Sequence, residues 1–137
     1  MDPSTRLLVD VEEIRHLIVR MARVTDHGDV SEYADLIAVD ASWQMPGSDV
    51  VRGRDNVMAS ARERRAGGLT GPGANTRHVV SMVSVSVEGD RASAQSSWQY
   101  FGQTTTSPTL LAIGSYADAF VRTSNGWRFS ERIATAG

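Results

Sequence analysis

The strongest constraint on the fold is a change in hydrophobic period along the chain. Between Leu8 and about Thr25, apolar residues recur on one helical face, and Gly28 follows as a stop signal. From Thr76 onward, alternating apolar segments are separated by short turn sequences such as 88–90 and 124–126. Helices followed by hairpin-linked strands predict an α+β fold, in which a curved antiparallel sheet packs against the helices.

The segment between these two regions predicts two further helices. Asp29 and Glu32 have the spacing of a capping box for a short helix, and Gly53 precedes a longer helix that ends at Gly67. A strand over 41–45 and a short return strand over 50–52 are expected between them. The whole chain, residues 1–137, is therefore expected to form a single domain.

Composition and missing motifs narrow the functional classes. The formal net charge of -2 gives no general attraction to nucleic acid or to an anionic membrane, and the absence of cysteine excludes thiol chemistry. No metal-ligand spacing and no phosphate-binding loop occurs, so we expect no metal and no cofactor. No uninterrupted apolar run suits a membrane span or a signal peptide, and we expect a cytoplasmic protein.

Two polar residues are predicted to face the interior from separate segments. Asp26 lies at the end of the first helix on an edge of its apolar face, and His78 opens an apolar strand. Because an unpaired buried charge is costly, the simplest arrangement is a contact between them. Such a dyad in an apolar cup would be a general base. The alternatives are a helix-end cap for Asp26 and a core histidine for His78.

Several other side chains are candidates for a ligand pocket, although they could equally form a solid core. They are expected on inward faces and comprise Tyr33, Trp43, Met45, Ser96, Trp98 and Tyr116. The glycine-rich stretch 66–74 is either a lid or a solvated connection. The outer sheet face is expected to carry Val83, Val85 and Val87, an apolar patch that predicts a homodimer or homotrimer.

In several ordered motifs the chain resembles the SnoaL-like branch of the NTF2-like superfamily, whose members are small cone-shaped α+β proteins with a curved, mixed or antiparallel sheet. The motifs span nearly the whole chain: Asp26-His27-Gly28-Asp29, Asp40-Ala41-Ser42-Trp43, Gly53, Thr76-Arg77-His78, Glu88-Gly89-Asp90, Gly114-Ser115-Tyr116-Ala117-Asp118 and Gly126-Trp127-Arg128-Phe129. The fold hosts many activities, so the resemblance is informative about architecture first.

The resemblance also implies a chemistry. Scytalone dehydratase and the hexachlorocyclohexane dehydrochlorinase of this superfamily use an Asp–His pair at positions that match Asp26 and His78, where the histidine removes a proton. Trp43 matches a tryptophan that lines the pocket, and Arg122 is the nearest match to an assisting arginine.

Two hypotheses follow. The first is a cofactor-independent lyase or isomerase, of the dehydratase or double-bond isomerase type, that acts on a small apolar cyclic molecule such as a polyketide-like ring. The alternative is a non-catalytic ligand-binding protein, or a partner subunit that resembles the small subunit of ring-hydroxylating dioxygenases.

Overall fold

A computed structural model describes residues 1–137 and contains three helical segments and six strands. The helices are α1 (Pro3–His27), the 3-10 helix η1 (Val30–Asp35) and α2 (Arg54–Ala66). The strands are β1 (Ile37–Gln44), β2 (Val51–Arg52), β3 (Arg77–Glu88), β4 (Arg91–Gly102), β5 (Thr109–Thr123) and β6 (Gly126–Ala136). The predicted α+β class is confirmed, and the second predicted helix is a short 3-10 segment. None of the helices is both long and apolar enough to cross a membrane.

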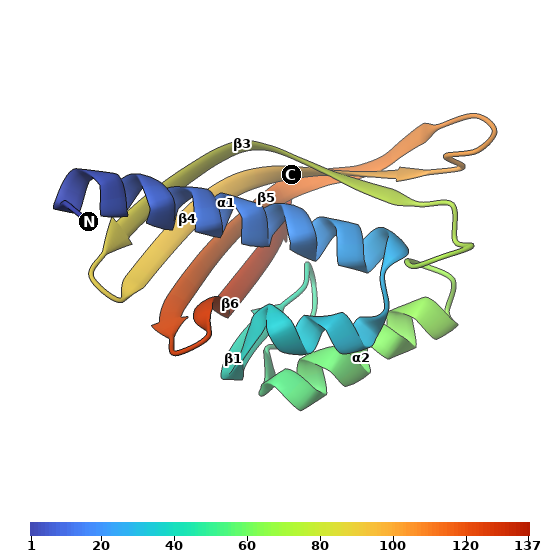
Figure 1. Cartoon of the computed structure of the whole chain (residues 1–137). Helices are drawn as coiled ribbons and strands as arrows, with labels where there is room; N and C mark the ends of the chain where they lie inside the picture. The colour runs from blue at the N-terminus through green and yellow to red at the C-terminus, as the bar shows by residue number, and fades with distance from the viewer.

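The strands form one mixed sheet in the order β2-β1-β6-β5-β4-β3. β1 runs parallel to β6, and every other neighbouring pair is antiparallel. In Figure 1 the long strands curve over α1, while α2 lies beside β1. α1 therefore lies on the concave side of the curved sheet.

Local sequence signals explain where the first two helices begin. Asp2 caps α1, because its carboxylate accepts a hydrogen bond from the backbone N–H of Thr5 at 3.0 Å, and Pro3 follows at the first turn. Asp29 and Glu32 form the predicted capping box of η1. These caps satisfy N–H groups that have no partner within the helices.

The core lies between the apolar stripe of α1 and the centre of the sheet. Ile14 and Ile18 are one helical turn apart and almost fully buried, as are Phe120 and Phe129 on the facing strands. Each such side chain contributes about 1.5–3 kcal/mol by leaving water. This packing fixes the position of α1 on the sheet, and with it the position of Asp26.

A β-bulge at Met82 overturns the prediction that Val83, Val85 and Val87 lie on the outer face. Between the register pairs Ser81–Ser97 and Ser84–Gln95, β3 has one residue more than β4. Met82 takes a positive φ of 54° and is largely exposed. The extra residue reverses the alternation, so the three valines turn inward and pack against the core.

A second register shift, between β5 and β6, changes which residues of β6 point inward. Strict alternation from Trp127 and Phe129 would place Glu131 inside. The register shifts between the pairs Ala119–Glu131 and Phe120–Phe129, and Arg132 is buried instead, while Glu131 is exposed. The two bulges decide which polar side chains reach the interior.

Candidate active site

Asp26 and His78 are in direct contact, although 52 residues separate them in the chain. Oδ1 of Asp26 lies 2.8 Å from Nδ1 of His78, and Oδ2 accepts the backbone N–H of His78, also at 2.8 Å. Asp26 is 3% exposed. When Asp26 is a carboxylate it accepts a hydrogen bond from Nδ1–H of His78, so the Nε2 lone pair of His78 is left free to act as a base.

A guanidinium from α2 supports the helix end that carries Asp26. Arg65 donates hydrogen bonds to the backbone carbonyls of Val24 and Gly28, each at 2.6 Å, and a longer one of 3.4 Å to that of Thr25. The C-terminus of a helix carries partial negative charge, which disfavours a nearby carboxylate. The positive charge of Arg65 offsets this effect and anchors the last turn of α1.

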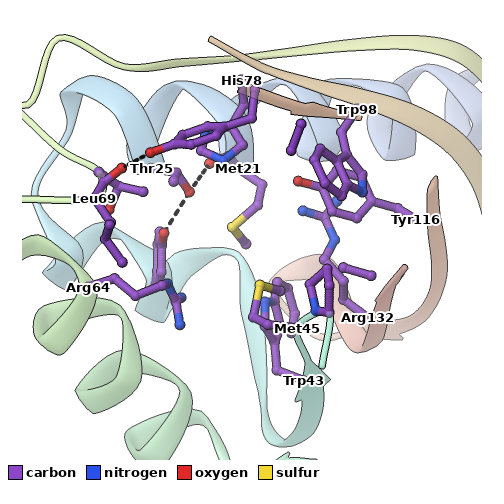
Figure 2. Close-up of a pocket in the computed structure, with 16 residues that line it drawn as sticks. Met21, Thr25, Trp43, Met45, Arg64, Leu69, His78, Trp98, Tyr116 and Arg132 are labelled. Carbon is purple, nitrogen blue, oxygen red and sulfur yellow. Dashed lines mark hydrogen bonds between the residues drawn. The ribbon is translucent and has the colours of Figure 1, made fainter. Parts of the chain in front are cut away.

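The dyad borders a mostly apolar cavity of about 280 Å³. His78 lines it, together with five of the predicted pocket residues: Tyr33, Trp43, Met45, Trp98 and Tyr116. Its size and lining suit a small ring system held by a few polar contacts. Figure 2 shows His78 above the cavity, with Thr25 and Leu69 on one side and Tyr116 and Arg132 on the other.

The glycine-rich stretch 66–74 forms part of the cavity wall through Leu69 and Thr70. The carbonyl of Leu69 accepts hydrogen bonds from the hydroxyls of Tyr100 and Thr76, the latter at 3.4 Å. These contacts tie the loop to β3 and β4 beside His78.

Arg132 is a buried cationic side chain at the cavity, which Arg64 also lines, and sequence analysis missed it. Its Nε and Nη2 donate to the carboxylate of Asp118 at 2.8 and 3.0 Å, and both residues are almost fully buried. The guanidinium carbon lies 3.7 Å from the centre of the Tyr116 ring. Nη1 makes no hydrogen bond within the protein, and it is accessible because Ser96 Oγ is the only buried side-chain polar atom without a partner. A donor is therefore free at the cavity.

Asp118 is the signal in the sequence that pointed to this arginine. It alternates with Tyr116 and Phe120 on β5, which places its carboxylate inside the fold. An inward carboxylate requires a partner, and the arginines of β6 were available to provide one. The register shift in β6 hid which arginine it was.

Two predicted binding residues lie outside the cavity lining. Arg122 donates to both oxygens of Asp10 at 2.8 Å and to Asp90 at 2.9 Å, and it stacks on Trp127. The donors of Arg122 are therefore used within the fold, away from the cavity. Ser96 is buried beside Tyr116 in the sheet, and its hydroxyl has no partner.

A curved mixed sheet that closes with helices around a cavity defines the cone-shaped, NTF2-like class of proteins. Residues 6–133 match the SnoaL-like domain, and the chain belongs to that family. The comparison with curated proteins gives no match.

Solved structures support the same fold. An NTF2-like protein with a cystatin-like fold from Novosphingobium aromaticivorans is 27% identical, with a TM-score of 0.79 over 97% of this chain and 85% of its own. A proposed dehydratase of the NTF2-like family from Streptomyces avermitilis is 19% identical, with a TM-score of 0.78 over 94% of this chain and 97% of its own. A proposed scytalone dehydratase from Novosphingobium aromaticivorans is 18% identical, with a TM-score of 0.78 over 98% of this chain and 88% of its own. At these identities the similarity concerns the fold.

Proposed function

We propose that the protein is a cofactor-independent lyase or isomerase that removes a proton from carbon in a small cyclic ketone. The observation that carries the proposal is the Asp26–His78 contact at the edge of an apolar cavity that also contains a free guanidinium N–H. A positioned base and a hydrogen-bond donor to the developing oxyanion are the two groups that enolisation requires.

The chemistry divides between the two sides of the cavity. Nε2 of His78 takes a proton from the carbon next to the carbonyl. The electron pair of the broken C–H bond forms a C=C bond to the carbonyl carbon, and the π pair of the C=O bond moves onto the oxygen. Asp26 orients the imidazole ring of His78 and stabilises the imidazolium that forms. Nη1 of Arg132 donates a hydrogen bond to the enolate oxygen.

Two outcomes are open to the enolate. In a dehydration, an electron pair of the enolate oxygen re-forms the carbonyl and the C=C pair moves to form the α,β double bond. The C–O bond to the β-hydroxyl breaks, and the imidazolium of His78 protonates the departing oxygen to give water. In an isomerisation, the same proton returns to a different carbon. Neither outcome requires a redox step.

The test is conversion of β-hydroxy and β,γ-unsaturated cyclic ketones, followed by the ultraviolet absorbance of the conjugated enone. Asp26→Asn and His78→Gln are expected to lower kcat/KM by about 10²–10⁴-fold, the usual contribution of a positioned base. His27→Gln is the matched control, since His27 adjoins Asp26 but is exposed. Activity within twofold of the wild type in both dyad variants would rule out this mechanism.

The alternative, a ligand-binding protein without chemistry, uses the same cavity. It is supported if the wild-type protein binds these ketones and never converts them. A partner subunit used only for assembly has less support, because an open cavity with a free donor serves no assembly role.

A further inference from the structure

Two guanidinium groups line the cavity, and only one of them has a counter-charge. Nε of Arg132 lies 2.8 Å from the carboxylate of Asp118, which neutralises it. Arg64 lines the same cavity, but its side chain forms no ion pair and donates no hydrogen bond within the protein. No aspartate or glutamate is among the residues that line the cavity. The charge of Arg64 is therefore left without a partner beside a mostly apolar surface.

The buried face of α2 brings Arg64 to the cavity. Val57, Ala61 and Arg64 follow the i, i+4, i+7 spacing of one helical face, and the first two are buried in the core. Figure 2 shows the side chain of Arg64 reaching from α2 on the side of the cavity where Leu69 lies, with Arg132 on the opposite side. A helix that only packed against the core would have an apolar residue at this position. A half-buried guanidinium there requires another explanation.

The neighbouring arginine differs, because its donors are used within the fold. Arg65 is also half-buried, and it donates to two backbone carbonyls at the end of α1, each at 2.6 Å. Asp49 and Glu63 share an adjoining pocket with Arg64, but both are exposed and neither pairs with it. A partly desolvated cation is unfavourable without a partner, and an anionic group of a ligand would supply one.

We infer that the ligand of this cavity carries a single carboxylate group, which Arg64 binds. A planar carboxylate accepts two parallel hydrogen bonds from one guanidinium, so it matches this side chain in shape and in charge. A phosphate monoester with two negative charges matches it less well, because the second charge would have no counter-charge in the cavity. The apolar body of the ligand lies against side chains such as Met45 and Trp98. The inference rests on the proposed function only in that the same cavity holds the substrate; it adds that the substrate is an organic acid.

Isothermal titration calorimetry with two matched probes tests the inference. 2-Naphthoate carries a carboxylate on a bicyclic ring, and 2-naphthamide has nearly the same shape without the charge. Neither probe contains a ketone, so their binding does not depend on the proposed reaction. At neutral pH we expect the wild-type protein to bind naphthoate about 10–100-fold more tightly than naphthamide, the usual contribution of hydrogen bonds to a charged partner.

Four variants assign the preference to one side chain. Arg64→Met should bring the two affinities within about twofold of each other, because naphthoate loses its charged partner. Arg64→Lys should keep a smaller preference, because an ammonium supplies the charge without the paired N–H groups. Arg62→Met is the matched control: Arg62 is on the same helix but exposed and outside the cavity lining, so the preference should stay. The double substitution Asp118→Leu with Arg132→Met removes the other guanidinium together with its counter-charge, and should also leave the preference unchanged.

Equal affinities of the two probes for the wild-type protein would overturn the inference. So would a preference that persists in Arg64→Met, or one that Arg62→Met lowers as much, since the cause would then be the general charge of the helix. A preference that is lost only in the double variant would assign the carboxylate to Arg132 instead. A clear preference in a wild-type protein that forms no enone would leave this inference standing and remove the proposed reaction. Enone formation without the preference would do the reverse.

Discussion

Two buried carboxylates, Asp10 and Asp118, each pair with an arginine, and the two arginines differ in how many of their donors the fold uses. Beside the N-terminal half of α1, Arg122 donates hydrogen bonds to both oxygens of Asp10, to Asp90 and to the carbonyl of Gly89. At the cavity, Arg132 binds both oxygens of Asp118 and makes no other hydrogen bond. All three nitrogens of the Arg122 guanidinium donate hydrogen bonds within the fold, while Nη1 of Arg132 donates none.

This difference separates a cation that stabilises the fold from one that is able to bind a ligand. The Asp10 cluster also receives the indole N–H of Trp127 at 3.1 Å, so its carboxylate is satisfied from three directions. A buried polar group that is fully satisfied has little left to offer to a ligand. A buried guanidinium with one unused donor at a cavity is still able to bind a ligand, as the proposed function requires.

The largest effect is expected from breaking the cavity pair. Asp118→Ala leaves the guanidinium of Arg132 buried and without a counter-charge, and should lower the free energy of unfolding by about 3–5 kcal/mol. Urea denaturation followed by circular dichroism measures the change.

The matched control for this variant is the double substitution Asp118→Leu with Arg132→Met, which removes both charges. It should recover most of the lost stability, because apolar side chains often replace a buried ion pair without cost. If the double variant is as unstable as Asp118→Ala, the loss comes from packing and not from the unpaired charge.

The next largest effect is expected on activity, where the two arginines can be compared directly. Arg132→Met removes the proposed donor to the enolate and should lower kcat/KM for the cyclic ketones by about 10²–10³-fold, the usual cost of losing such a donor. Arg122→Met changes the same residue type outside the cavity and should leave kcat/KM within about threefold at a temperature where it stays folded. Equal losses in both variants would contradict the distinction drawn between the two arginines.

A smaller effect on stability is expected at the Asp10–Arg122 pair, and it depends on pH. Hydrogen bonds from Arg122 hold the pKa of the Asp10 carboxyl below its usual 3.8. A carboxyl whose pKa is lowered in the folded state stabilises the fold at pH values above its usual pKa. This contribution is lost as the pH falls through the lower pKa of the folded state. Asp10→Asn should therefore cost about 2 kcal/mol at neutral pH, and the difference from the wild type should shrink below pH 3.8. Denaturation curves at several pH values measure it, and a difference that stays constant would contradict the assignment.

The smallest effect concerns a third guanidinium, which binds only backbone carbonyls. Arg65→Met should cost about 1 kcal/mol in unfolding free energy, because the carbonyls at the end of α1 then depend on water. Arg64→Met is a suitable control, since the side chain of Arg64 makes none of these bonds. Thermal unfolding measures both, and an equal loss in the two variants would remove the anchoring role of Arg65.

Much of the fold follows from the sequence because its signals are local. The helical stripe of Ile14 and Ile18, the capping box of Asp29 and the turn at Gly126 each depend on a few neighbouring residues. The inward direction of Asp26 and His78 follows from periodicity within single elements. That periodicity also places Tyr33, Trp43 and Trp98 in the interior, while their role with a ligand stays a prediction.

The errors arise where register between strands overrides periodicity within a strand. The direction of Val83 follows from the extra residue at Met82, and the burial of Arg132 follows from the shift near Phe129. A bulge is a property of two paired strands, so neither strand's own pattern contains it. Periodicity alone therefore gave no reason to expect Arg132 in the interior.

The bulge at Met82 also bears on how this gene can change. Before it, β3 presents His78 to the cavity; after it, the same strand presents Val83, Val85 and Val87 to α1. Loss of the single codon for Met82 would remove the bulge and leave the three valines inward, because Val83 would then follow Ser81 in strict alternation. Point substitutions can reshape the cavity half of the strand while the helix-packing half stays as it is. A change of one residue in length is therefore expected to be tolerated at Met82, where the bulge absorbs it, and to be selected against elsewhere in this strand, where it would turn side chains to the opposite face.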